Sequence, residues 1–163
     1  MQPNLTVSVD TAAMLMAVTK RTLWRHLAEG QYSHLPKDPQ GRTVLWIHEV
    51  AAKFIIELLP GDGDPDTDDY ALLALADQGV ANCQCDFAIF LMEQEQYALA
   101  AHWLTLAARA GGGHPDAMHH LSALHEAGLG VQRCVETAMV WRSKASQQGH
   151  LIAKAQLDAL QNG

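Results

Sequence analysis

The sequence is poor in the residues that build disulfide frameworks and membrane spans. Only three of the 163 residues are cysteines, and the first ten residues contain neither the basic segment nor the apolar run of a secretory signal peptide. An odd number of cysteines without such a signal is typical of a reducing cytoplasm. No apolar run approaches the roughly 20 residues that span a bilayer. We therefore expect a cytoplasmic protein that does not associate with membranes.

The sequence also lacks the motifs of common enzyme and metal sites. It has no glycine-rich phosphate loop, no nucleophile elbow and no His-Glu-x-x-His zinc motif. Cys83 and Cys85 have no second pair to complete a zinc site. His119 and His120 precede His125 by six and five residues, whereas a zinc-binding pair on a helix is spaced by four. The sequence thus predicts a protein that is not an enzyme and that binds no metal or cofactor.

Charge is distributed unevenly along the chain. Eighteen acidic residues against eleven lysines and arginines give a net charge of −7. Residues 1–58 contain six basic and five acidic side chains, or +1, and the remainder contains five basic and thirteen acidic ones, or −8. The overall balance argues against non-specific nucleic-acid binding, but the asymmetry means that each part has to be judged separately.

A segment rich in proline, glycine and aspartate separates the two parts. Residues 60–67 read Pro-Gly-Asp-Gly-Asp-Pro-Asp-Thr, a composition that interrupts helices and favours turns. We therefore predict an N-terminal domain at 1–59, an acidic linker at 60–67 and a C-terminal domain at 68–163.

A pattern recurs in the C-terminal domain. Two tryptophans are each followed by an alanine after four residues and by a glycine after eight; the copies are Trp103, Ala107, Gly111 and Trp141, Ala145, Gly149. The second copy follows a longer set of small and aliphatic residues, namely Ala117, Leu121, Gly128, Gly130 and Val131. Such repetition is the signature of stacked helix pairs, which usually bind other proteins. Both tryptophans are expected in the core between the helices.

The full pattern resembles the Sel1-like repeat, a relative of the tetratricopeptide repeat. The resemblance implies a short α-solenoid of antiparallel helix pairs with a protein-binding concave face. Periodicity and helix-breaking residues predict six helices, or about three pairs, near the minimum for a stable stack. They are expected at 68–78, 83–92, 97–110, 115–127, 136–148 and 151–160.

The N-terminal domain begins with two short helices joined by a tight turn. Asp10 is suited to cap a helix over residues 11–17. Thr19 is suited to cap a second, basic helix over residues 20–28, and Gly30 follows as its stop. Two such helices, the second rich in lysine and arginine, form a helix-turn-helix.

A strand and a third helix are expected next. The β-branched and aromatic run at 43–47, which includes Trp46 as a core residue, predicts a strand, and a turn at Gly41 would make it a small wing. Residues 48–59 predict a helix whose buried side chains are Val50, Ala51, Phe54, Ile55 and Leu58.

These passages together resemble the winged helix-turn-helix of MerR-like and excisionase-like proteins. The matching segments are Val9–Ala13, Val18–Leu23, Gly30, Gly41–Arg42 and His48–Val50. The resemblance covers about residues 5–58 and implies a DNA-binding domain. The fold class expected for the whole chain is mainly α, with a small winged helix-turn-helix domain followed by a short α-solenoid.

The basic helix supplies the candidate contacts to double-stranded DNA. Leu23 and Leu27 share the face expected to be buried, and Arg21 and Arg25 lie four residues apart on another face. Because the N-terminal half of a recognition helix contacts the bases, we assign Arg21 and Arg25 to base edges.

Phosphate contacts are expected beside them. Lys20, Thr22 and His26 are the candidates on the same helix, and Arg42 at the wing could reach a phosphate or the minor groove. Trp24 has two interpretations, contact with a DNA sugar or packing within the domain, and packing is favoured.

The sequence therefore predicts a bacterial-type, DNA-binding transcriptional regulator whose repeats bind a protein partner, a second copy of the chain, or both. A single domain of charge +1 should bind DNA poorly alone, which favours a homodimer. Two other hypotheses remain. One is a non-enzymatic interaction adaptor whose winged domain no longer binds DNA, and the other is an excisionase-like factor that bends DNA.

Overall fold

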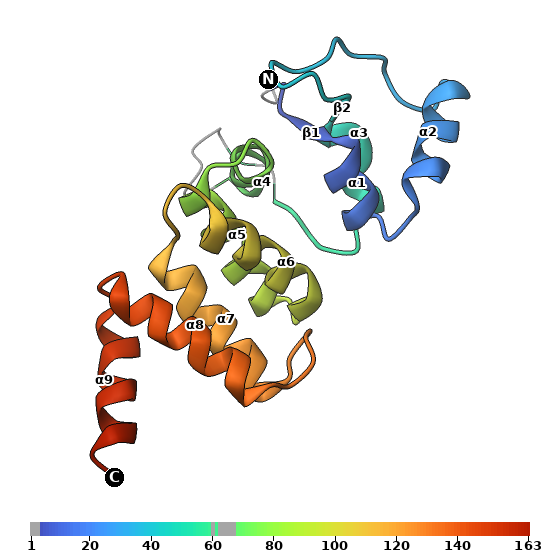
Figure 1. The fold of residues 1–163 in the computed structure, drawn as a ribbon. Helices are drawn as coiled ribbons and strands as arrows, with labels where there is room; N and C mark the ends of the chain where they lie inside the picture. Colours follow the sequence, from blue (N-terminus) through green and yellow to red (C-terminus); the bar gives the residue numbers. More distant parts are fainter. Residues whose placement is uncertain (1–3, 60, 62–67) are drawn as a thin grey trace. The chain divides into compact units, whose positions relative to one another are not determined.

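The computed structural model of the protein is mainly helical and has one small antiparallel sheet among the residues it describes, which are 4–59, 61 and 68–163 (Figure 1). Contacts between Cα atoms divide the chain into two compact units, Met1–Gln78 and Gly79–Gly163. Apart from Gly61, the predicted linker lies outside the described residues. No helix in the described part combines the length and the apolar character needed to cross a bilayer.

The first unit begins with a strand and two short helices joined by a tight turn. Strand β1 is Thr6–Ser8, helix α1 is Val9–Leu15 and helix α2 is Lys20–Ala28. In the turn, Ala17 has a φ of 53°, the left-handed conformation for which glycine is the usual residue. The bounds of α1 and α2 confirm the two predicted helices. In the turn between them, an alanine occupies the position where such turns commonly use glycine.

Hydroxyl groups cap both helices. Ser8 Oγ accepts a hydrogen bond from the amide of Thr11 at 3.3 Å and caps α1. The predicted cap at Asp10 is wrong, because β1 runs directly into α1 and the helix starts earlier. The predicted cap of α2 is confirmed, since Thr19 Oγ1 accepts from the amide of Thr22 at 3.1 Å. These caps satisfy amides that a helix leaves unpaired at its start.

The sheet joins the beginning of the unit to its middle. Strand β2 is Val44–Trp46, and it pairs antiparallel with β1. The predicted strand is present, but no second strand precedes it within the described loop. Gly41, with a φ of 77°, instead lies in a turn in which the amide of Asp38 donates to the carbonyl of Arg42. The wing expected around Gly41 is thus a looped turn rather than a β-hairpin.

The third helix is much shorter than predicted. Helix α3 covers Ile47–Val50 and passes into a 3₁₀ turn, η1, at Ala51–Lys53. Phe54 is already extended, with a ψ of 149°, and the amide of Ile55 donates to the carbonyl of Leu15 at 2.8 Å. This long-range bond replaces the intrahelical one, and β-branched Ile55 suits an extended backbone. The predicted burial of Ile55 is wrong, since 47% of the residue is exposed.

Helix α4, Asp69–Asp77, lies within the first unit and packs on β1. The sequence predicts this helix well but groups it with the repeats. Asp68 caps it by accepting from the amide of Tyr70 at 2.9 Å. The core of the unit contains side chains with no exposed surface, and these include Val7, Leu15, Leu23, Leu45, Ile47 and Leu73.

The second unit contains five helices in its described residues, and the last four each pack on the helix before them (Figure 1). They are α5 at Ala81–Glu93, α6 at Tyr97–Arg109, α7 at Pro115–Ala127, α8 at Val135–Gln147 and α9 at Leu151–Gln161. The predicted helices in this region are confirmed to within two residues at each end.

The two repeated tryptophans differ in burial. Trp103 is 1% exposed and meets the ring of Phe87 edge-on at a centroid distance of 5.3 Å, which confirms it as a core residue. Trp141 is only half-buried, and the Lys144 ammonium lies 4.7 Å from its ring centroid. The copy with the glycine-rich loop is therefore packed less deeply at its tryptophan.

Two glycines shape the loop between α7 and α8. Gly128 ends α7 in the left-handed conformation, with a φ of 71°. At Gly130, with a φ of 68°, an added Cβ would lie 2.3 Å from the carbonyl carbon of Tyr97 and 2.4 Å from the amide nitrogen of Ala98. The loop thus rests directly on the first turn of α6, where only a residue without a side chain fits.

Replacing Gly130 with alanine is therefore expected to destabilise the second unit strongly. Gly149→Ala is a matched control, because Gly149 has a φ of 90° but no atom within 4 Å of the added Cβ. The control should cost about 1 kcal/mol of left-handed strain, and Gly130→Ala about 1–3 kcal/mol more from the backbone overlap. Hydrogen exchange of the α6 and α7 amides would measure both. Equal losses in the two variants would contradict the packing described here.

Candidate nucleic-acid interface

Helix α2 buries one face and exposes the other. Leu23 and Leu27 are 0% and 2% exposed, and they anchor the helix to the rest of the unit. Arg21 and Arg25 are exposed, as predicted from their spacing. Trp24, favoured as a packing residue, is 49% exposed. Trp24 is therefore not a core residue, and it lines a surface hollow together with Ser8 and Arg42.

The exposed cations of α2 are only loosely held by acidic neighbours. Lys20 Nζ lies 2.7 Å from Asp10 Oδ1, with both side chains more than 60% exposed. Arg25 Nε lies 3.9 Å from Glu29 Oε1. Arg21 has no ion pair among the described residues. Exposed pairs of this kind contribute little, so all three side chains are free to turn to another anion.

The two remaining candidates on α2 are less accessible. The hydroxyl of Thr22 is 2.9 Å from that of Thr19, within the cap of the helix. His26 is half-buried, its ring centroid lies 6.4 Å from that of Tyr32, and its Nδ1 has no hydrogen-bond partner within the described part of the chain. Both residues lie beside the exposed arginines rather than among them.

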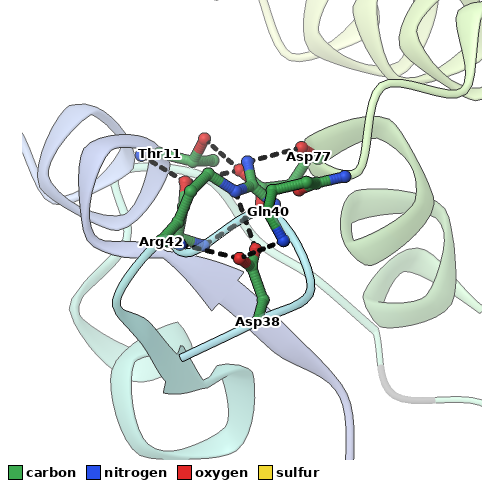
Figure 2. Close-up of polar contacts among 6 residues, drawn as sticks. Thr11, Asp38, Gln40, Arg42 and Asp77 are labelled. Carbon is green, nitrogen blue, oxygen red and sulfur yellow. Dashed lines mark hydrogen bonds and ion pairs between the residues drawn. The ribbon is translucent and has the colours of Figure 1, made fainter. Parts of the chain in front are cut away.

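Arg42, predicted to reach DNA from the wing, is turned inward. Its Nε donates to Asp38 Oδ2 at 2.7 Å, its Nη1 donates to the carbonyl of Asp77 at 2.9 Å, and its Nη2 lies 3.2 Å from Asp77 Oδ2 (Figure 2). One third of the side chain is exposed. Each nitrogen of the guanidinium therefore has a partner in the first unit. In the free protein, Arg42 is not an unpaired, exposed cation at the wing.

The carboxylate of Asp77 gathers donors from three segments, and its side chain is 4% exposed. Besides Arg42, it accepts from the amide of Ser8 at 3.0 Å, from Ser8 Oγ at 2.6 Å and from Thr11 Oγ1 at 2.5 Å. Figure 2 shows Thr11 and Arg42 reaching Asp77 from different elements. We call this set, Ser8, Thr11, Arg42 and Asp77, the Asp77 clamp.

Asp38 orients the guanidinium of Arg42. It accepts from the amides of Arg42 and Gln40 at 2.8 and 3.0 Å as well as from Arg42 Nε (Figure 2). Partial burial alone would raise the pKa of Asp38, but the hydrogen bonds and the positive charge of Arg42 outweigh it and lower the pKa below 3.8. The carboxylate stays ionised and fixes one edge of the guanidinium.

A shallow groove runs between α2 and the loop that precedes β2. Its lining includes Trp24 from α2, Lys37 and Gly41 from the loop, and Ser8 and Arg42 from the clamp. Lys37 is exposed, and sequence reasoning passed over it because a lone lysine between two prolines carries no recognisable signal. The groove places a cation and an aromatic ring beside the exposed face of α2.

Two histidines of the second unit, His114 and His150, cap helices. His150 Nδ1 accepts from the amide of Ala153 at 3.1 Å and caps α9, while its Nε2 lies 3.4 Å from Asp116 Oδ1. His119 stacks on His150 at a centroid distance of 4.3 Å. Burial, reinforced by nearby cations, lowers the pKa of His119. No group of three or more His, Cys, Asp or Glu side chains in the described residues is placed to hold a metal.

Comparison of the chain with models of protein families, with curated proteins and with solved structures gives no match. The interpretation of the α2 surface and of the groove therefore rests on the residues themselves.

The stability of the first unit is expected to depend on Asp38 in acid. Because the pKa of Asp38 is lower in the folded chain than in the unfolded one, its stabilisation is present above the unfolded value and is lost as the pH falls through the folded value, below 3.8. Asp38→Asn should lower stability near neutral pH and flatten the acid decline. Amide exchange in β1 and α1 would report it. An unchanged decline in the variant would show that Asp38 is not a stabilising carboxylate.

Proposed function

We propose that the chain is a DNA-binding transcriptional regulator, with a winged helix-turn-helix in its first unit and a short α-solenoid for protein interaction in its second. One observation carries the proposal. The exposed face of α2 presents Arg21, Trp24 and Arg25 together, while Leu23 and Leu27 fix the helix from behind. A cationic, accessible helix preceded by a short helix and a tight turn is the arrangement that inserts into a major groove.

In this proposal each residue of the surface has a distinct task. Arg21 and Arg25 contact base edges, where a guanidinium pairs best with guanine O6 and N7. Lys20 and Lys37 neutralise phosphates on either side of α2. The ring of Trp24 packs on the sugar-phosphate backbone at the mouth of the groove. Thr22 contributes to the N-terminal cap of α2, and the half-buried His26 packs beside Tyr32.

Selection from a random duplex library at two salt concentrations tests this function. The protein should enrich a defined motif, and Arg21→Ala/Arg25→Ala should lose affinity for it by about 30-fold or more, since each bidentate base contact contributes about 1–3 kcal/mol. Arg109→Ala/Lys154→Ala is the matched control, because it removes the same charge from exposed positions in the second unit. Enrichment that survives in the α2 variant would rule out this surface as the reader of sequence.

The second unit is proposed to bind a second copy of the chain or another protein. Helix α9 leaves three large apolar side chains open, with Leu151 80%, Ile152 59% and Leu160 60% exposed. Exposed apolar surface of this size on one helix favours association. A DNA-binding domain with a net charge of only +1 over residues 1–58 also gains affinity when two copies act together.

Sedimentation equilibrium at micromolar concentrations is expected to show a dimer. Ile152→Glu/Leu160→Glu should make it monomeric, because it places charge on the apolar face of α9, whereas Gln161→Glu adds charge at an exposed polar position on the other side of the same helix and should leave the dimer intact. A wild-type monomer throughout this range would contradict self-association and direct the search to a different protein partner.

The inward position of Arg42 favours a second candidate, an interaction adaptor whose first unit no longer binds DNA. In that case the cations of α2 would meet an acidic protein surface. Absence of both enrichment and salt-dependent binding in the library selection would select the adaptor.

A further inference from the structure

The Asp77 clamp is built from the donors that bind phosphate in protein–DNA complexes. A backbone amide, two hydroxyl groups and a guanidinium converge on one carboxylate. Serine and threonine hydroxyls, amides and arginine are the usual partners of phosphate oxygens. A carboxylate and a phosphodiester both present two anionic oxygens with a single negative charge, so the same donors can accept either group.

The clamp borders the surface proposed to meet DNA. Ser8 and Arg42, which donate to Asp77, also line the groove that contains Trp24 and Lys37. A DNA strand that lies along α2 and contacts Lys37 would therefore pass next to these donors. Asp77, at the end of α4, is not among the residues that line this groove; it lines a neighbouring hollow together with Asp38 and Arg42.

We propose that Ser8, Thr11 and Arg42 form a subsite for a DNA backbone phosphate and that Asp77 occupies it in the free protein, which makes the docking of α4 autoinhibitory. The inference rests on the proposed DNA-binding function and adds a competition between an internal and an external anion. On binding, the phosphate displaces the carboxylate, and α4 loses its attachment to β1 and α1.

Asp38 keeps the guanidinium of Arg42 oriented during this exchange. It holds Arg42 through Nε at 2.7 Å, while Nη1 and Nη2 point to Asp77. When Asp77 leaves, the Nη edge of the guanidinium stays in the same orientation, ready for two parallel bonds to a phosphate. The charge around Arg42 is the same before and after, so no cation is left without a partner.

Asp77→Asn tests the competition directly. Asparagine keeps the size of the side chain and its carbonyl acceptor but removes the charge that holds Arg42. Affinity for the selected duplex should rise about tenfold, the scale of a hydrogen bond to a charged group, because the phosphate no longer has to displace a carboxylate. Asp69→Asn, which removes the same charge from the other end of α4, is the matched control and should leave the affinity unchanged.

Substitution of Arg42 is expected to reverse the effect of Asp77→Asn. In the Asp77→Asn background, Arg42→Ala should abolish the gain in affinity. The proposal would be overturned if Asp77→Asn gained no more affinity than Asp69→Asn, or if the gain persisted without Arg42. Asp77 would then have only a structural role. Because wild-type binding is measured in the same series, loss of the proposed function itself would appear separately, as absent binding in all variants.

Hydrogen exchange on the wild-type protein keeps the test independent of how well Asp77→Asn folds. Saturating with the selected duplex should speed exchange of the amides of α4, Asp69–Asp77, because displaced Asp77 no longer ties the helix down, while α2 becomes protected. Protection of α2 with unchanged or slower exchange in α4 would contradict the displacement of Asp77.

Discussion

The carboxylate of Asp77 is the point on which the first unit depends. A charge with 4% of its side chain exposed is costly unless it is paired and fully hydrogen-bonded. Here Ser8, Thr11 and Arg42 meet that requirement, and they come from the N-terminal strand, the first helix and the loop before β2. The carboxylate thus joins the adjoining β1 and α1 to two segments distant in sequence, the loop before β2 and α4.

This arrangement divides the basic residues by task. The guanidinium of Arg42 organises the loop and α4, and the exposed cations left for a ligand are those of α2 together with Lys37. Helix α4 ends at Asp77, and the chain continues through Gln78 to Gly79, where the second unit begins.

Features set by neighbouring residues could be predicted from the sequence, and those set by distant partners could not. Local propensity and periodicity predict the cap at Thr19 and the buried pair Leu23 and Leu27. They also predict the bounds of the helices in the second unit. The predicted length of the third helix is wrong because the amide of Ile55 donates to a carbonyl in α1, forty residues away in sequence. The inward turn of Arg42 likewise depends on Asp77, which the sequence analysis assigns to the C-terminal domain.

The most direct test of the account is a crystal structure of the protein bound to its selected duplex. The account predicts the N-terminal half of α2 in the major groove, with a backbone phosphate on Ser8, Thr11 and Arg42 and with Asp77 displaced. A bound duplex with Arg42 still on Asp77 would contradict the role given to the clamp. A duplex held by any surface other than α2 would contradict the account as a whole.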